Sequence, residues 1–180
     1  MRNKIVYYVA SSLDGFIAGE NDDVSQFLLE GKGIEKYQSD LSKFATVIMG
    51  RKTYEFGFQF GLVPGQPVYP HMKHFIFSDT LKIDTLSESV QIEKPSVDTI
   101  NEIRQHAKTD IYLCGGGLFA GWLLDNGLID QLKLKLNPVV LGTGTKLFGS
   151  STKTQTWELA DKESFFGGLQ ILTYTKRNKR

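Results

Sequence analysis

The chain has 180 residues, which is the length of one domain, and its 41% hydrophobic and 23% charged residues are typical of a globular protein. Its formal net charge of +1 provides no general attraction for nucleic acid or for an anionic membrane surface. The single cysteine, Cys114, excludes an internal disulfide, and no apolar stretch reaches the length of a membrane span, so a cytoplasmic protein is expected.

Strands and helices are predicted to alternate along the first part of the chain. Residues 4–10 are β-branched and aromatic, which is typical of a buried strand, and the run is too short for the apolar segment of a signal peptide. Asp14-Gly15 indicates a turn, and residues 19–33 predict a loop with room for one helical turn. Apolar side chains at helical spacing over residues 34–44 then predict an amphipathic helix.

The middle of the chain continues this alternation. Residues 46–49 predict a second strand, and residues 74–77 predict a third. Between them, the prolines and glycines of residues 61–70 predict a surface loop. Ser96 is the expected N-cap of a helix whose apolar side chains recur over residues 97–107.

The last third of the chain predicts more strands. Residues 110–114 predict a buried strand that runs into three glycines and then a helix. Leucines alternate with lysines over residues 131–136, so this strand is expected to expose one face to water. Residues 157–164 and 169–176 flank a glycine pair and predict a β-hairpin. The order predicts one α/β domain over residues 1–180, with a mostly parallel sheet and antiparallel strands added at one edge.

Two strand ends carry residues suited to phosphate binding. The first is Gly50-Arg51-Lys52-Thr53, where two cations and a hydroxyl donor follow a buried strand. If a helix begins there, its free N–H groups also face an anion. The alternative is a polar strand end with a helix cap, and the residues alone leave both open.

The second strand end is Gly115-Gly116-Gly117, which permits unusual backbone dihedrals and close approach of a ligand. A tight strand-to-helix turn without a ligand is the alternative. With Ala120 the run fits the dinucleotide fingerprint G-x-G-x-x-A. A Rossmann fold is not predicted, because that motif should open the domain and be followed by an acid, whereas the next strand here ends in Asn137-Pro138.

These segments occur in an order that is recognisable. The segments are Ala10 followed by SLDGFIAG (12–19), VIMGRKTYE (47–55), IFS (76–78), CGGGLF (114–119) and LIDQLKLKLNPVVLGTGTKLF (128–148). Together they resemble the dihydrofolate reductase-like superfamily, and within it the branch with the reductase domain of the bifunctional riboflavin-biosynthesis deaminase/reductase. The resemblance covers nearly the whole chain.

The resemblance implies a three-layer α/β/α fold and a reductase that transfers a hydride from NADPH to a small heterocycle, either pteridine-like or 5-amino-6-(5-phosphoribosylamino)uracil-like. It implies that Ala10 and Ile17 hold the nicotinamide carboxamide through their backbone, and that Ser78 lies near the adenosine ribose. The remaining cofactor-binding positions it implies are Gly50, Arg51, Lys52 and Thr53 at the phosphates, and Gly115, Gly116, Gly117, Leu118 and Phe119 along the pyrophosphate and nicotinamide.

Three positions depart from the family pattern. Asp79 stands where dihydrofolate reductases often carry an Arg or Thr that grips the 2′-phosphate, so NADH stays possible beside NADPH, although Arg51 could hold that phosphate. Cys114 replaces a glutamate that usually serves the substrate in the riboflavin-pathway reductases, and Phe16 replaces a frequent lysine. The substrate therefore stays open.

Candidate substrate-site acids come from the first loops. Dihydrofolate reductases carry a substrate-binding carboxylate on the helix after the first loop, and the resemblance implies Glu30 as its counterpart because of its distance from Ile17 in the sequence. Asp22 and Asp23 lie in the same loop, and the alternative for Glu30 is an exposed loop charge. Asp14 borders the nicotinamide pocket in the family and could position the substrate or relay a proton, whereas turn chemistry alone also explains it.

Other partners follow less directly. The resemblance implies a homodimer, for which the strand 131–136 and the hairpin 157–176 could supply the surface. His71 and His74 have no acid or cysteine at ligand spacing, so no metal site is expected. Two other functions stay open: a non-catalytic dinucleotide-binding sensor or assembly protein, and a flavin- or deazaflavin-dependent reductase. The basic tail, comprising Lys176, Arg177, Lys179 and Arg180, is expected to be solvated.

Overall fold

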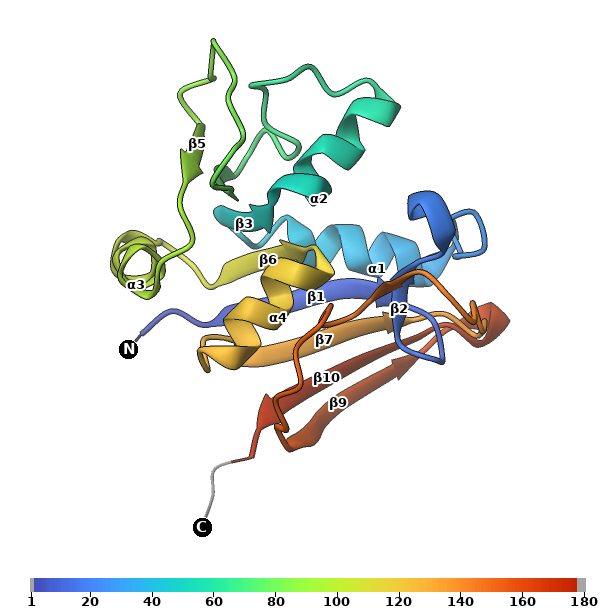
Figure 1. Ribbon diagram of the computed structural model, residues 1–180. Helices are drawn as coiled ribbons and strands as arrows, with labels where there is room; N and C mark the ends of the chain where they lie inside the picture. The colour runs from blue at the N-terminus through green and yellow to red at the C-terminus, as the bar shows by residue number, and fades with distance from the viewer. Residues whose placement is uncertain (1, 178–180) are drawn as a thin grey trace.

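The computed structural model describes residues 2–177, which form an eight-stranded sheet with helices on both faces (Figure 1). The spatial order of the strands is β5 (Val90–Glu93), β4 (Lys73–Phe77), β3 (Thr46–Gly50), β6 (Ile111–Gly115), β1 (Ile5–Ser11), β7 (Gln131–Leu136), β10 (Gln170–Lys176) and β9 (Trp157–Ser164). In this order the strands from β5 through β7 run parallel to one another, whereas β10 is antiparallel to both of its neighbours. The predicted parallel sheet with antiparallel C-terminal strands is confirmed.

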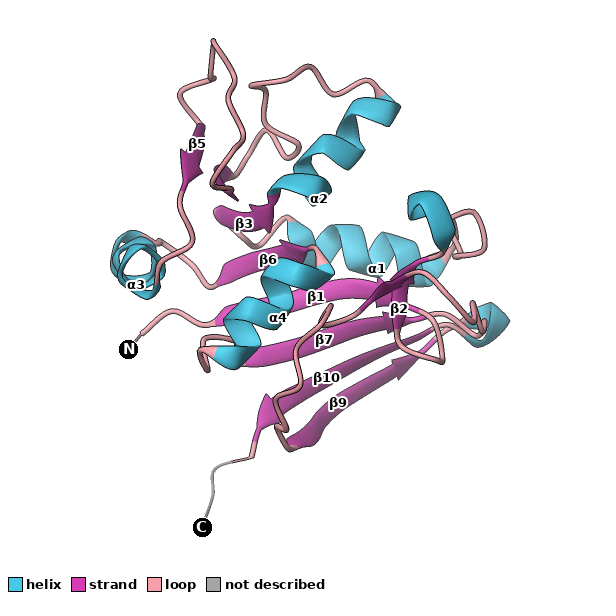
Figure 2. Cartoon of the chain, in the orientation of Figure 1, coloured by secondary structure: helices cyan, strands magenta, loops and turns pink. Residues whose placement is uncertain are grey.

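The helices form two outer layers, as Figure 2 shows. The helix α1 (Lys32–Leu41) covers one face of the sheet, and α3 (Val97–His106) and α4 (Gly117–Asp125) cover the other. Because side chains alternate along a strand, Tyr7 lies in the core under α3 and α4, whereas Tyr8 lies in the core under α1. The predicted three-layer α/β/α architecture is therefore confirmed.

The ends of the helices follow the local sequence. The side chain of Ser96 accepts a hydrogen bond from the backbone N–H of Thr99, so the predicted N-cap of α3 is confirmed. The helix α2 (Arg51–Phe56) begins directly after β3, as the phosphate-binding interpretation required. The predicted loop over residues 19–33 contains one helical turn, a 3-10 turn at Glu20–Asp22.

Three short strands were not predicted. β2 (Phe16–Ala18) and β8 (Thr145–Lys146) pair only with each other, and β5 lies at the edge of the sheet. Segments of two to four residues are too short for a periodic pattern to reveal them.

The expectation that β7 exposes one face to water is wrong. Lys133 and Lys135 lie beneath α1, and Lys135 is only 7% exposed. The ammonium group of Lys133 pairs with Asp40 of α1 at 2.6 Å, which offsets the cost of burying it. The alternating leucines and lysines therefore mark a strand that is covered on both faces. Apolar side chains pack on one face, and the lysines contact α1 on the other.

The described ends of the chain lie on the side of the molecule where the parallel strands have their amino ends (Figure 1). The side chain of Asn3 donates to the backbone oxygen of Ala107 at the end of α3, and Lys176 donates to Gly127 just after α4. Arg177 is exposed and pairs with Glu158, as a solvated tail would allow. The other two basic residues of the tail, Lys179 and Arg180, lie outside the described residues. Within residues 2–177, no helix has both the length and the apolar character needed to cross a membrane.

Candidate active site

The two glycine-bearing strand ends lie side by side. β3 and β6 are adjacent parallel strands, and Met49 pairs with Gly115 at their carboxyl ends. The turns that follow are also in contact, because a Cβ atom added to Gly116 would lie 2.8 Å from the hydroxyl oxygen of Thr53. A Cβ atom added to Gly50 would lie 3.1 Å from the Cβ of Phe119. Two parts of the chain that are distant in sequence thus form one surface.

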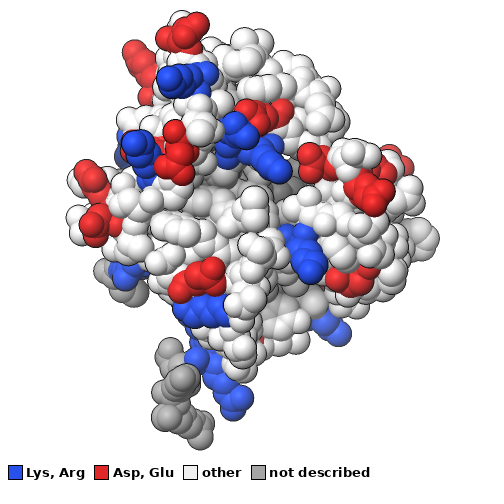
Figure 3. All heavy atoms as spheres, in the orientation of Figure 1, with Lys and Arg blue, Asp and Glu red and all other residues white. Residues whose placement is uncertain are grey.

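This surface is the floor of a cleft of about 1610 Å³ at the carboxyl ends of the parallel strands. Figure 3 shows a hollow in this side of the molecule, with Lys and Arg side chains on its rim. Its volume exceeds that of an ordinary small-molecule pocket of roughly 300–1,000 Å³, so a dinucleotide and a second ligand have room together. All residues predicted to bind the cofactor line it: Ala10, Ile17, Gly50, Arg51, Lys52, Thr53, Ser78, Gly115, Gly116, Gly117, Leu118 and Phe119.

One end of the cleft carries positive charge and a well-defined turn. Arg51 donates to the hydroxyl group of Thr80 at 3.2 Å and lies 3.6 Å from the carboxylate of Glu55. The hydroxyl oxygen of Ser78 accepts hydrogen bonds from the backbone N–H groups of Thr80 and Leu81. Ser78 therefore holds the loop that brings Thr80 to Arg51. A guanidinium group beside a hydroxyl donor suits a phosphate oxygen.

The middle of the cleft is backbone rather than side chain. The N-cap of α4, Gly116, has no side chain that could satisfy the first N–H groups of the helix. Gly117 is required for packing, because a Cβ atom there would come within 2.2 Å of the backbone oxygen of Lys146. This close approach places β8 against the start of α4. The resulting row of backbone groups can approach an anionic ligand closely.

The other end of the cleft is lined by neutral aromatic and sulfur groups. The hydroxyl groups of Tyr37 and Tyr112 share a hydrogen bond at 2.8 Å, and that of Tyr69 lies 3.7 Å from the sulfur of Cys114. Burial raises the pKa values of the three phenols and of the Cys114 thiol. These groups therefore keep their protons at neutral pH and act as neutral hydrogen-bonding partners.

Tyr69 is held in place by a buried histidine. The imidazole Nε2 of His74 accepts a hydrogen bond from the backbone N–H of Tyr69 at 3.1 Å, while Nδ1 contacts the backbone oxygen of Met72 at 3.0 Å. Burial lowers the pKa of His74 to about 4, so the ring is neutral. His74 thus holds the long connection after α2 against the start of β4. This contact positions Tyr69, which lines the cleft.

The two residues predicted as acids lie outside the lining of the cleft. The Asp14 carboxylate accepts a 2.6 Å hydrogen bond from Ser12 and hydrogen bonds from the backbone N–H groups of Leu141 and Gly142. It therefore joins the loop after β1 to the loop after β7. Glu30 is exposed. The catalytic roles of Asp14 and Glu30 stay predictions, and the carboxylate of that first loop which does line the cleft is Asp22.

The neutral end contains the residues that sequence reasoning missed. The sequence singles out no role for Tyr37 on the helix predicted over residues 34–44, marks Cys114 only as a departure from the family pattern, and leaves Tyr69 in the proline-rich connection. No motif spacing links Tyr37, Tyr69 and Tyr112. Their meeting depends on how α1 and the connection fold over β6, which the local pattern does not encode.

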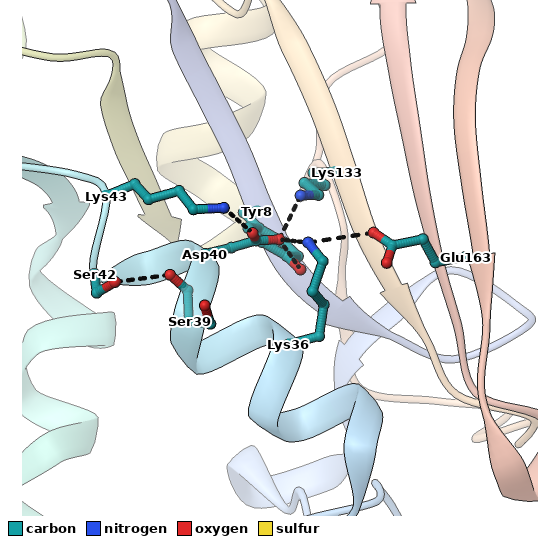
Figure 4. Close-up of polar contacts among 8 residues, drawn as sticks. All are labelled: Tyr8, Lys36, Ser39, Asp40, Ser42, Lys43, Lys133 and Glu163. Atoms are coloured by element: carbon teal, nitrogen blue, oxygen red, sulfur yellow. Dashed lines mark hydrogen bonds and ion pairs between the residues drawn. The ribbon is translucent and has the colours of Figure 1, made fainter.

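A second polar cluster lies at the far end of α1, away from the cleft (Figure 4). The Asp40 carboxylate accepts hydrogen bonds from Lys36, Lys43 and Lys133 at 2.6 Å, 2.9 Å and 2.6 Å. Burial alone would raise the pKa of Asp40, but the three ammonium groups hold it well below its usual value. Lys36 also pairs with Glu163 of β9 at 3.2 Å. This cluster fastens α1 to β7 and to the edge hairpin.

Known proteins share this sequence pattern over most of its length. The family model of the RibD C-terminal domain matches residues 3–171. Two uncharacterized proteins of Bacillus subtilis (strain 168), YyaP and YwjB, are 25% and 28% identical to the chain. The alignments cover 96% and 95% of this chain, and 95% and 97% of theirs.

Solved structures share the fold. A protein of Shewanella sp. PV-4, whose name assigns it provisionally to riboflavin biosynthesis, superimposes with a TM-score of 0.81 at 23% identity, over 99% of this chain and 100% of that chain. The Thermotoga maritima diaminohydroxyphosphoribosylaminopyrimidine deaminase/5-amino-6-(5-phosphoribosylamino)uracil reductase gives 0.74 at 15% identity, over 98% of this chain and 57% of that one. Dihydrofolate reductase of Enterococcus faecalis, complexed with NADP(H), gives 0.69 at 16% identity, over 99% of both chains. These likenesses establish a dihydrofolate reductase-like fold.

Proposed function

Because the chain belongs to the RibD C-terminal domain family, we propose that it is an oxidoreductase that uses NADPH to reduce a small heterocycle of the pteridine or aminopyrimidine type. One observation carries this proposal: a charged end and a neutral aromatic end are continuous in a single cleft. A dinucleotide with charged phosphates and a reactive ring, together with a planar substrate, needs both kinds of surface side by side.

The residues present fit the cofactor. At Gly115, Gly116 and Gly117 no side chain stands between a phosphate and the backbone, and the first N–H groups of α4 have no side-chain cap. Arg51 and Lys52 supply positive charge beside this turn. These residues would hold the phosphates.

The nicotinamide supplies the hydride when it is bound. Ala10 and Ile17, which both line the cleft, would hold the ring through their backbone groups. Tyr37 and Tyr112 would orient the substrate with hydroxyl groups that stay protonated. The apolar residues of this end would keep water away from the substrate, so that water does not compete for its hydrogen-bonding groups.

NADPH binding provides the first test. Titration of the protein with NADPH should give a saturable change in protein fluorescence, and Arg51→Ala should weaken binding about 10- to 100-fold because a charge-assisted hydrogen bond is lost. Arg177→Ala is the matched control, since that arginine is exposed and pairs with Glu158 away from the cleft. Absence of saturable binding, or equal binding by both variants, would contradict the proposal.

The choice between NADPH and NADH depends on opposing charges at one turn. Arg51, fixed by Thr80, favours a 2′-phosphate, whereas the exposed Asp79 repels it. We expect the wild type to prefer NADPH, Asp79→Asn to increase that preference, and Arg51→Ala to weaken NADPH binding more than NADH binding. NADPH binding without oxidation across a panel of pteridines and aminopyrimidines would instead indicate a non-catalytic binding protein.

A homodimer remains part of the proposal. β7 cannot offer a free edge, because it pairs with β1 on one side and with β10 on the other. The hairpin of β9 and β10 is the remaining candidate surface, since β9 closes the sheet on that side. Light scattering at two protein concentrations would give the mass, and a monomer at both would refute this part.

A further inference from the structure

The charged residues that line the cleft are unevenly placed. Arg51, Lys52 and Asp79 follow the strands β3 and β4, and Lys146 lies against the start of α4. These four residues lie beside the turns proposed to hold the cofactor. Among residues 2–177, the remaining charged residue that lines the cleft is Asp22, in the connection from β2 to α1. This connection therefore presents a negative charge and no cation to the cleft.

A tight turn holds Asp22 in an exposed position. The backbone N–H of Gly19 donates to the backbone oxygen of Asp23 at 2.7 Å and closes the turn. Asn21 and Asp22 have φ values of 56° and 60°, in the left-handed region that Asn and Asp side chains tolerate best after glycine. Within residues 2–177, no donor or cation pairs with the Asp22 carboxylate, so it is available to a ligand.

Two aromatic rings line the same cleft. Phe56 ends α2, and Phe60 ends the 3-10 turn that follows, with 5.1 Å between the ring centres. Phe60 is 71% exposed although its ring is large and apolar. The face of an aromatic ring attracts a cation, whereas it offers no attraction to a phosphate group.

We propose that Asp22 selects a substrate whose ring carries a positively charged substituent and no phosphate. This proposal rests on the proposed function, because it names the substrate class of the same cleft. The ring lies at the neutral end, and its substituent extends to the exposed part of the lining, which includes Asp22 and Phe60. A phosphate there meets a carboxylate without a compensating cation, since Arg51 and Lys52 hold the cofactor. An ammonium group meets an opposite charge and an aromatic face.

Pterins with one ring system and differently charged substituents provide the probes. At ring position 6, an aminomethyl group is positive at pH 7, a hydroxymethyl group is neutral, and the phosphate ester of the hydroxymethyl group is strongly negative. Each compound should be titrated by calorimetry into protein saturated with NADP⁺, the form of the cofactor that allows no turnover. We expect the aminomethyl compound to bind about 10-fold or more tightly than the phosphate ester, with the neutral compound between them.

The variants assign this preference to individual residues. Asp22→Asn keeps the size of the side chain and the left-handed backbone without the charge, and should reduce the preference to about 3-fold or less. Asp23→Asn is the matched control from the same turn, because the Asp23 carboxylate accepts from the backbone N–H of Ser25 and does not line the cleft. Phe60→Leu should weaken binding of the aminomethyl compound about 2- to 5-fold, whereas Phe166→Leu, at an exposed ring outside the cleft, should not.

The outcomes are distinguishable. Failure to bind either form of the cofactor overturns the proposed function. With normal cofactor binding, only the role of Asp22 is overturned if the phosphate ester binds as tightly as the aminomethyl compound, if no pterin binds, or if Asp22→Asn keeps the wild-type preference. Thermal unfolding of each variant checks that it is folded before binding is measured.

Discussion

The hydroxyl oxygens of Tyr37 and Tyr112 lie 2.8 Å apart and join α1 to β6 at the neutral end of the cleft. The two residues are 75 positions apart in the chain. Burial raises the pKa of both phenols, so the contact stays a neutral hydrogen bond across the ordinary pH range. This contact between layers therefore links the position of the helix to the shape of the site.

Removal of this hydrogen bond should reveal energetic coupling between the two tyrosines. Tyr37→Phe and Tyr112→Phe should each lower the free energy of unfolding by about 1 kcal/mol, because each leaves a buried partner without its donor or acceptor. In the double variant the losses should be less than additive by about 1 kcal/mol. Urea unfolding of the four proteins measures the cycle, and strict additivity would show that the contact contributes nothing.

Asp40 should be important for stability because it neutralises the partly buried ammonium group of Lys133. Asp40→Asn leaves the Lys133 ammonium without its carboxylate and should cost about 3 kcal/mol of the free energy of unfolding. Lys43→Met removes a partner that is 69% exposed and should change it by less than about 0.5 kcal/mol. Similar losses in both variants, measured by urea unfolding, would contradict this account of the cluster.

Asp14 should contribute stability that depends on pH. The hydrogen bond from Ser12, aided by the backbone N–H groups of Leu141 and Gly142, lowers the pKa of Asp14 from 3.8 to about 2. Because the folded-state pKa lies below the unfolded value, this contribution is present above pH 3.8 and is lost as the pH falls toward 2.

Acid titration of stability tests this difference. The gap in melting temperature between the wild type and Asp14→Asn should be largest above pH 4 and should close between pH 3.8 and about 2. Asp161→Asn, at an exposed position of β9, is the control for the loss of one carboxylate. A gap that is constant with pH would show that Asp14 acts only through its shape.

Gly117 should be intolerant of any side chain. An added Cβ atom would come within 2.2 Å of the backbone oxygen of Lys146, so Gly117→Ala must displace either β8 or the start of α4. We expect a loss of about 1–3 kcal/mol in the free energy of unfolding, together with weaker NADPH binding. Gly19→Ala is the control, because its added atom meets nothing closer than 3.4 Å. Equal stability of both variants would be evidence against the close approach.

Lys135 should lower stability in the free protein. Lys135→Met should raise the free energy of unfolding by about 1 kcal/mol at pH 7, because burial of the side chain disfavours its charged form and Met is apolar. Burial lowers the folded-state pKa below the ordinary value of 10.5, so the wild type gains stability as the pH rises toward that value. The advantage of the variant should therefore shrink as the pH rises toward 10.5 in thermal unfolding. An advantage that grows with pH would contradict this assignment.

The sequence predicted the charged half of the cleft well, for a physical reason. β3 and β6 are apolar runs that end in glycine, and parallel strands place their carboxyl ends at one edge of the sheet. Since β3 and β6 are also neighbours in the sheet, Arg51 and Gly116 lie close together. Local pattern and global topology agree here, so short motifs were enough.

The neutral half could not be predicted in this way. Tyr69 reaches the cleft only because His74 binds its backbone, and Tyr37 does so because α1 is fastened to β7 through Asp40. The exposure of Lys135 was predicted wrongly for the same reason. Alternating lysines usually mark a solvent-exposed face, and only tertiary contact with α1 buries them. Contacts between layers decide these positions, and periodicity does not record such contacts.

The positions of the described chain ends have a practical consequence for handling the protein. β1 begins and β10 ends at the edge of the sheet that lies away from the cleft, near Ala107 and Gly127. An affinity tag, a fluorescent fusion or a surface tether joined at either end would therefore extend from the side of the molecule that lies opposite to the opening of the cleft. Immobilised protein should still admit its ligands freely.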